Sequence, residues 1–194
     1  MARANSNAIV YAIAKIFREY IVDANSLTSE YSYKSASSKL ERLNFILKDV
    51  SIFAGLISGE YFSNKANYWT AGLFISAAIN KVIKEDDTVT LDFAGLGCPS
   101  DCIGYRFKQG KIVLQSNAGD YIGEGMSGGE ITIQGNAGYY AGYNMSGGHI
   151  TIQGNAAGHV GTYMSGGVIQ IEGQIGSIAQ SCRGRIYHRG TLLQ

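Results

Sequence analysis

The chain has 194 residues, a formal net charge of +1, and 26 glycines beside a single proline. The near balance of charge leaves no electrostatic footprint for nucleic acid, and glycine without proline argues against collagen and against a proline-rich linker. No apolar run reaches the roughly 18 residues of a membrane span, and the N-terminus does not have the pattern of a signal peptide. We therefore expect a cytoplasmic protein that binds neither nucleic acid nor membranes.

Apolar residues recur at helical spacing in the N-terminal half, which predicts amphipathic helices over about 6–22, 37–57 and 64–84. The segment from Asn25 to Ser38 is rich in serine and tyrosine, and we predict a loop there. The apolar faces suit a small helical bundle with its own core. Two alternatives stay open: one helix serves a partner, or the first helix belongs to an organelle transit peptide, which its acidic residues disfavour.

A change in glycine content marks the domain boundary. Only Gly55, Gly59 and Gly72 precede residue 91, so 23 of the 26 glycines lie after it. We therefore divide the chain into a helical domain, residues 1–90, and a glycine-rich domain, residues 91–194.

The glycine-rich domain is a tandem repeat with a fixed period of about 19 residues, a length typical of solenoids. Three copies occupy 112–130, 131–149 and 150–168, a shorter fourth begins at Ile169, and 93–111 is a degenerate first copy. Each copy holds one short segment of alternating apolar and polar residues and leaves no room for a helix. The sequence thus predicts an α+β protein, in which a helical region precedes a right-handed parallel β-helix.

Residues that recur once per copy should stack on one another in the β-helix. Glycine pairs supply the backbone angles of a corner, while isoleucines and methionines fill the interior, with Phe107 in the methionine's place in the first copy. Asparagines should form an amide ladder in which each side chain bonds to the next. The predicted structural repeat residues are Gly128, Gly129, Gly147, Gly148, Gly166, Gly167, Asn117, Asn136, Asn155, Met126, Met145 and Met164.

A short rod of this kind exposes unpaired backbone groups and apolar side chains on its terminal coils. Solenoids normally cap these ends. We expect the N-terminal helices to cover one end or one face of the rod, and a partner or a second copy to cover what remains.

The repeat also resembles a known family. The unit GNAGxYxGxxMSGGxIxIxG, at 135–154 and in the neighbouring copies, resembles the GXGXG repeat domain, which occurs in one subunit of formylmethanofuran dehydrogenase and in the C-terminal part of the glutamate synthase large subunit. The segment 184–190 resembles the way in which such domains finish, and the resemblance covers about residues 91–194. It implies a β-helix without chemistry of its own, which acts as a scaffold in a cytoplasmic redox or amidotransfer complex.

Three functions are compatible with these patterns. The leading one is a non-catalytic structural or assembly subunit, without catalytic residues or cofactors, bound to other subunits of such a complex. The second is a stand-alone, homo-oligomeric protein-binding module. The third is an enzyme that uses the groove between the helices and the rod, but the carboxylates of the repeats do not form the column that solenoid enzymes usually present.

Two motifs resemble signatures of chemistry. The segment 123–128 matches the dinucleotide pattern GxGxxG, and 125–129 matches the nucleophile pattern GxSxG. Both signatures require a helix after the turn, whereas a predicted strand follows at Ile131. Ser127 also recurs as Ser146 and Ser165, as a corner residue would. We therefore interpret both segments as corners.

The three cysteines, Cys98, Cys102 and Cys182, are the metal candidates, with His188 as a conceivable fourth ligand. Their spacing falls short of a four-ligand site, which favours free or buried thiols, and a redox disulfide between Cys98 and Cys102 is the alternative. His149 and His159 occupy unrelated places in the repeat, so no histidine column forms.

Five tyrosines crowd neighbouring copies between the asparagine ladder and the methionines. Because the narrow interior is already filled, some of them must point outward, and tyrosine is favoured at interfaces. We predict that they meet a partner subunit; ordinary surface tyrosines stacked between coils are the alternative. The residues of this predicted interface are Tyr121, Tyr139, Tyr140, Tyr143 and Tyr163.

Overall fold

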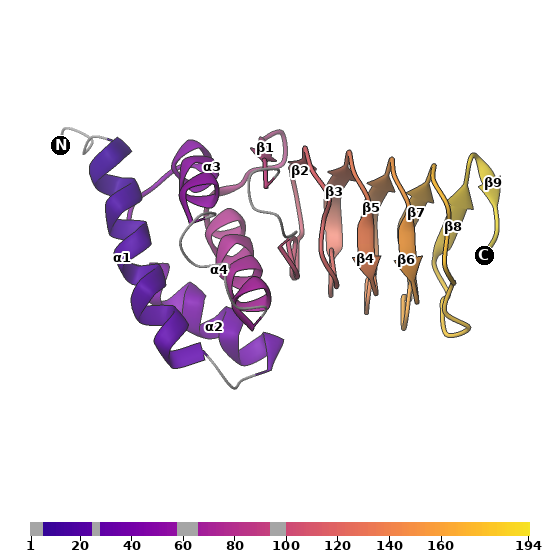
Figure 1. Cartoon of the computed structure of the whole chain (residues 1–194), viewed down its shortest axis with the longest axis horizontal. Coiled ribbons are helices and arrows are strands. Elements are labelled where there is room, and N and C mark those ends of the chain that lie inside the picture. The colour runs from indigo at the N-terminus through magenta and orange to yellow at the C-terminus, as the bar shows by residue number, and fades with distance from the viewer. Residues whose placement is uncertain (1–5, 25–27, 58–65, 94–99) are drawn as a thin grey trace.

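The computed structural model describes residues 6–24, 28–57, 66–93 and 100–194. Its N-terminal half is a group of helices, and its C-terminal half is a rod of stacked coils whose strands run parallel (Figure 1). The predicted fold class, an α-helical region followed by a parallel β-solenoid, is confirmed. In the described part of the chain, no helix combines the length and apolar character needed to span a bilayer.

Four helices are described: α1 (Ser6–Ala24), α2 (Ser29–Leu40), α3 (Leu47–Leu56) and α4 (Ala66–Val82). The predictions for α1 and α4 are confirmed. The predicted loop over 25–38 is wrong, because α2 begins at Ser29 and buries Ser32, Ala36 and Leu40, which lie one helical turn apart. The predicted single helix over 37–57 is also wrong, because the chain leaves the helical conformation between α2 and α3.

The break between α2 and α3 has a cause elsewhere in the chain. The Lys81 ammonium, from α4, donates to the carbonyl oxygens of Leu40, Glu41 (2.8 Å) and Leu43 (2.9 Å). A cation at the C-terminus of a helix stabilises its unpaired carbonyl groups. Lys81 therefore ends α2 through a contact that the local sequence does not contain.

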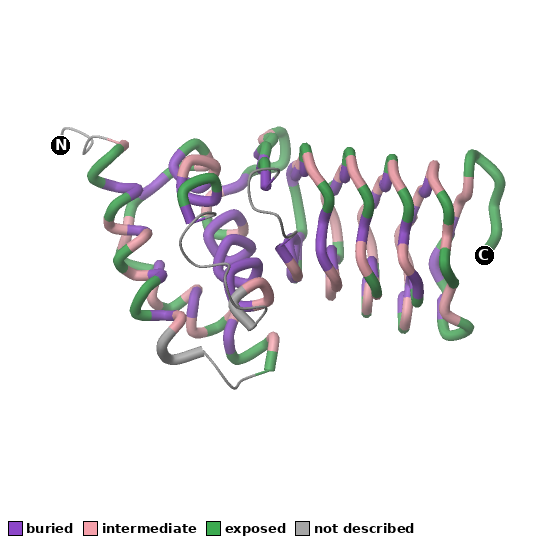
Figure 2. The backbone as a smooth tube through the Cα atoms, in the orientation of Figure 1, coloured by how far each residue is buried: buried purple, intermediate pink, exposed green. Residues whose placement is uncertain are grey.

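The core of the helical domain surrounds α4, in which every residue from Thr70 to Ile79 is buried. Phe74 packs against Phe17 and Tyr20 of α1 and Phe53 of α3, with ring centroids 5.0–5.6 Å apart. Aromatic rings at such distances contribute beyond the area that they bury. Helix α1, which supplies two of these rings, lies on the side of α4 that faces away from the rod (Figure 2).

The rod is built on a seven-stranded sheet in which all neighbours are parallel except the last pair. A second sheet pairs two short strands, β4 and β6, in parallel. The strands are β1 (Thr88–Leu91), β2 (Lys111–Leu114), β3 (Ser127–Ile133), β4 (Ala137–Tyr139), β5 (Gly147–Ile152), β6 (Ala156–Gly158), β7 (Val168–Ile171), β8 (Arg185–His188) and β9 (Thr191–Leu192).

The strand register confirms the predicted repeat and corrects its first copy. Successive strands of the large sheet from β2 to β7 are offset by one period, which pairs Ile112 with Ile131 and Ile131 with Ile150. The first coil is longer, since Val89 pairs with Ile112, so the sheet begins at Thr88 rather than at residue 93. One isoleucine from each strand from β2 to β8 of the large sheet is fully or almost fully buried, and these side chains form one internal ladder: Ile112, Ile131, Ile150, Ile169 and Ile186.

The corner glycines make room for the interior of the preceding coil. Gly148 has a φ of +89°, and a Cβ on it would lie 2.6 Å from the Cε of Met126. Gly129 and Gly167 stand in the same relation to Phe107 and Met145. A residue with a side chain at these positions would strain the backbone, because φ is positive, and its Cβ would clash with the side chain of the preceding coil.

The asparagine ladder bonds differently from the prediction. Asn117 Oδ1 accepts the backbone N–H of Asn136 at 2.8 Å, and Asn136 Oδ1 accepts that of Asn155 at 2.8 Å. Each asparagine side chain thus bonds to a backbone N–H of the next coil rather than to the side-chain amide of the next asparagine, because the coil spacing brings that N–H within reach.

The helices cover the end of the rod that begins with β1 (Figure 1). Ser76 of α4 donates to the Cys102 carbonyl oxygen at 2.9 Å and accepts the N–H of Gly104 at 2.9 Å. Asn80 donates to the Tyr105 carbonyl oxygen at 2.9 Å. One turn of α4 thus satisfies backbone groups of the first coil that would otherwise face solvent.

Candidate functional site

Three rings from successive coils form a stack on one side of the rod. Tyr121, Tyr140 and His159 lie one period apart, in equivalent places of the repeat. The centroids of Tyr121 and Tyr140 are 4.8 Å apart with an interplanar angle of 14°, and those of Tyr140 and His159 are 5.0 Å apart at 10°. Cys102 holds the corresponding place in the first coil. We call these three rings the aromatic stack.

The stack sits on left-handed backbone. The φ angles of Tyr121, Tyr140 and His159 are 58°, 62° and 53°. Each residue opens a tight turn, in which the N–H three positions later bonds to its carbonyl oxygen at 3.1–3.3 Å. This conformation costs on the order of 1 kcal/mol for a residue other than glycine, and stacked rings contribute about 0.5–1.5 kcal/mol per pair. The rings therefore offset the strain of the turns that carry them.

Further rings extend the stack in both directions. Trp69 of α4 meets Tyr121 edge to face at 4.9 Å, so the stack also joins the helices to the rod. Tyr143 stands nearly perpendicular to Tyr140 at 6.2 Å and to Tyr163 at 5.7 Å. Tyr139 lies 6.5 Å from Tyr140. We define the aromatic face as Tyr121, Tyr139, Tyr140, Tyr143, His159 and Tyr163.

The structure brings together all five tyrosines that the sequence singled out. Tyr139 and Tyr163 are 52% and 60% exposed, while Tyr121, Tyr140 and Tyr143 are partly buried by one another. Sequence reasoning missed His159 and Trp69. The sequence does contain a signal for His159, which follows Tyr140 by one period, but comparing the histidines with one another shows no column and leaves the tyrosine counterpart unused.

The charged side chains of this part of the rod are all of one sign, negative. Residues 112–182 contain no lysine or arginine, and they carry four carboxylates: Asp120, Glu124, Glu130 and Glu172. Glu130 pairs with Lys111 at 3.4 Å, away from the rings. Asp120 lies among the rings and accepts the backbone N–H of Tyr139 at 2.7 Å. The aromatic face is therefore acidic.

A cleft of about 580 Å³ opens where α2 meets the rod. Glu124 lies in it, and the Ser29 hydroxyl, at the first turn of α2, donates to its Oε2 at 3.4 Å. Gly125 contributes no side chain, which leaves the space open. The cleft is lined by Thr28, Ser29, Glu30, Tyr105, Arg106, Glu124, Gly125, Tyr143 and Asn144.

Burial shifts the titration of the groups near this cleft. It raises the pKa of Glu124, and it raises the pKa of Asp101 to about 6. The pKa of the Cys102 thiol is raised well above its usual range, because the thiol is buried and lies close to Glu124, with Sγ 3.9 Å from Oε2. Cys102 is therefore protonated at neutral pH and unsuited to act as a nucleophile.

The cysteines and histidines are not brought together. Cys182 is buried beside Met164, with the two sulfur atoms 3.9 Å apart, whereas Cys102 lies in the first coil. Cys98 lies outside the described residues. His149 pairs in register with Glu130 and Val168, and His188 Nε2 bonds to the Gly173 carbonyl oxygen at 2.8 Å. Within the described ranges, no three His, Cys, Asp or Glu side chains are grouped to hold a metal ion.

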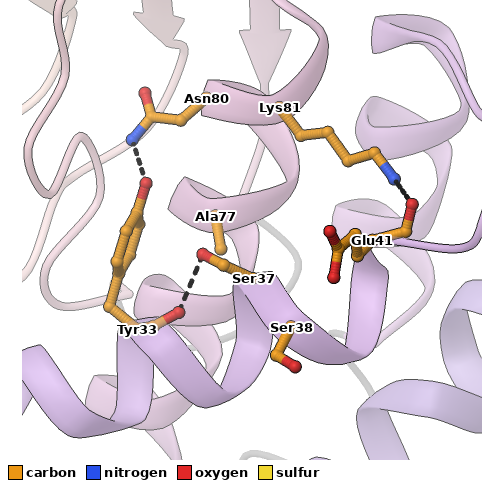
Figure 3. Close-up of a pocket in the computed structure, with 7 residues that line it drawn as sticks. All are labelled: Tyr33, Ser37, Ser38, Glu41, Ala77, Asn80 and Lys81. Atoms are coloured by element: carbon orange, nitrogen blue, oxygen red, sulfur yellow. Dashed lines mark hydrogen bonds between the residues drawn. The ribbon is translucent and has the colours of Figure 1, made fainter.

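The groove between α2 and α4 holds a structural network (Figure 3). Asn80 donates to the Tyr33 hydroxyl at 2.9 Å, and Ser37 donates to the Tyr33 carbonyl oxygen at 2.9 Å. Lys81 is engaged with the end of α2, as described above. The polar groups drawn there serve the packing of the two helices, and their arrangement does not pair a nucleophile with a base.

The segments 123–128 and 125–129 run from a turn directly into β3, and Ser127 is the exposed first residue of that strand. The strand in place of a helix removes the geometry that either signature needs.

Comparison of the chain with protein-family models, with curated proteins and with solved structures found no match in any of the three.

Proposed function

We propose that this chain is a non-catalytic assembly module, in which the capped rod presents the aromatic face to another subunit of a protein complex. The observation that carries the proposal is the convergence of five tyrosines and a histidine from three successive coils on one face. Tyrosine combines large apolar area with a polar tip and loses little freedom on binding, which suits it to interfaces.

The rigidity of the support favours the same function. The rings contact one another between successive coils, and each coil is bonded to the next along the whole sheet. A surface held in this way loses little conformational entropy when a partner binds. The resemblance of the repeat to GXGXG domains supports a cytoplasmic redox or amidotransfer complex as the setting, without a cofactor held by this chain. A homo-oligomeric module is the alternative.

The test compares two sets of tyrosine variants of the tagged chain, purified from its source. Tyr139→Ser with Tyr163→Ser should reduce the co-purified partner by about tenfold, since exposed interface tyrosines commonly contribute about 1 kcal/mol or more each. Tyr11→Ser, on α1, is the matched control, because Tyr11 is 68% exposed and lies far from the rod. Equal recovery with both sets would contradict the proposal.

A further inference from the structure

We infer that the aromatic face receives a basic segment of a partner protein, and that the cleft at Glu124 seats one arginine or lysine side chain of that segment. The inference rests on the proposed function and names the chemistry of the partner. It draws on three independent features: the charge of the rod, the shape of the cleft, and an arginine of this chain that already makes the same kind of contact.

The charge of the rod selects a cationic partner. The stretch 112–182 has four carboxylates and no lysine or arginine, while the whole chain has a net charge of +1. Opposite charge across an interface speeds encounter and suppresses wrong partners. A second copy of this chain would bring an equally acidic face against the first, so the same surface disfavours self-association through it.

The cleft suits a cationic head group. Glu124 stands one coil after Tyr105 and one coil before Tyr143, so its carboxylate lies between two aromatic neighbours in the same place of the repeat. Tyr143 is partly exposed and its ring is accessible from the cleft, whereas Tyr105 is buried and only its edge lines the cleft. Gly125, beside Glu124, leaves the entrance free. A carboxylate beside an aromatic ring is the chemistry that binds guanidinium and ammonium groups.

Arg106 shows this chemistry at the rim of the cleft. Its guanidinium carbon lies 5.6 Å from the centroid of the Tyr105 ring, and its Nη2 lies 3.4 Å from Glu30 Oε2. Glu30 also pairs with Lys34 at 2.8 Å. Among the described residues, Glu124 has no ion pair of this kind with a lysine or arginine. Of the two carboxylates in the cleft, Glu124 is the one left for a cation from outside.

The titration of Glu124 agrees with this geometry. Its pKa is raised by burial, and the hydrogen bonds from the Ser29 hydroxyl and the Cys102 thiol, with the Arg106 charge, compensate only in part. A cation bound at Glu124 favours the ionised carboxylate and lowers that pKa.

The probe is the peptide acetyl-(Gly-Arg)₃-amide, compared with the same peptide carrying citrulline, which keeps the shape of arginine without its charge. Titrations followed by NMR should give at least about tenfold tighter binding for the arginine peptide, with shifts at Tyr143 and Gly125. Glu124→Gln, which keeps the acceptor for Ser29, should reduce that affinity about tenfold. Glu130→Gln removes a carboxylate of the same rod away from the cleft and should leave the affinity almost unchanged.

The outcomes separate this inference from the proposed function. Equal binding of the two peptides, or full affinity of Glu124→Gln, overturns the cation site even if the tyrosine variants still lose the natural partner. Equal binding of free arginine methyl ester and the peptide overturns the partner segment and indicates a small-molecule site. If the tyrosine variants also keep the natural partner, the proposed function falls as well.

Discussion

At the scale of single residues, the left-handed tyrosines are the feature that most needs explaining. A bulky L-residue resists a φ near +60°, and glycine adopts it freely. The rod nevertheless places Tyr121, Tyr140 and His159 there. Their side chains must therefore supply something that glycine would not, and stacking between coils supplies part of it.

This balance predicts an unusual order of stability at position 140. Tyr140→Ala loses the stacking and keeps the strain, whereas Tyr140→Gly loses the stacking and relieves the strain. We expect the glycine variant to be more stable than the alanine variant by about 1 kcal/mol in urea unfolding. The reverse order would show that the backbone at this turn is not strained in solution.

Asp101 makes stability depend on pH in a direction opposite to that of most carboxylates. Its side chain accepts the N–H of Asp120 at 2.8 Å, and burial raises its pKa from an ordinary 3.8 to about 6. The folded state therefore binds this proton more tightly than the unfolded state, so its contribution to stability is full below about pH 4 and is lost as the pH rises through about 6.

Asp101→Asn keeps the acceptor and removes the titration. We expect the wild type to lose stability relative to this variant as the pH rises from about 4 to 7, measured as the difference between their free energies of unfolding. A difference that stays constant across that range would mean that Asp101 titrates normally.

The sequence predicted some of these residues and not others. Tyr139, Tyr140, Tyr143 and Tyr163 were found because the repeat fixes which residues fall on one side of the coil. Glu124 was not, because nothing in the sequence places Ser29 of a helix beside a carboxylate so far along the chain.

At the scale of elements, the joint between α4 and the first coil depends on one glycine. A Cβ on Gly72 would overlap the Asp101 carbonyl oxygen, so only glycine allows the helix this close to the coil. The hydrogen bonds of Ser76 and Asn80 to the coil require the same approach.

Gly72→Ala should therefore destabilise the protein by about 1–3 kcal/mol in urea unfolding, since the helix must move away from the coil. Gly55→Ala is the control, because it is also a helical glycine and a Cβ there would meet nothing within 4 Å. It should leave stability unchanged or raise it by up to about 1 kcal/mol. Equal effects of the two changes would mean that the joint is loose.

The elements differ in how far the sequence reveals them. The strands of the rod were predicted because the same apolar spacing recurs at the same place in every copy, so that each copy supports the strand predicted in the others. α2 was missed because its serines and tyrosines have modest helix propensity, and its buried face becomes apparent only when α4 packs against it. The end of α2 was missed because Lys81, which bonds to it, belongs to a different helix.

At the scale of the whole molecule, the helices and the rod have different roles. The helices lie at one end of the rod (Figures 1 and 2) and bond to backbone groups of its first coil, while the coils of the rod carry the aromatic face. The sequence predicted both parts and expected the helices to cover one end or one face. It did not indicate that α4 would do so, since that contact depends on an irregular first coil that is longer than the others.

The proposed function requires that this chain works as one piece of a larger complex. Native mass spectrometry of the tagged chain, purified from its source at physiological salt, reads out its bound partners without labelling or cross-linking. We expect a species in which the 20.8 kDa chain is joined to at least one different polypeptide in a fixed ratio. The tyrosine variants of the aromatic face should dissociate this species. A chain recovered alone, as a monomer or as a whole multiple of its own mass, would contradict the proposed function.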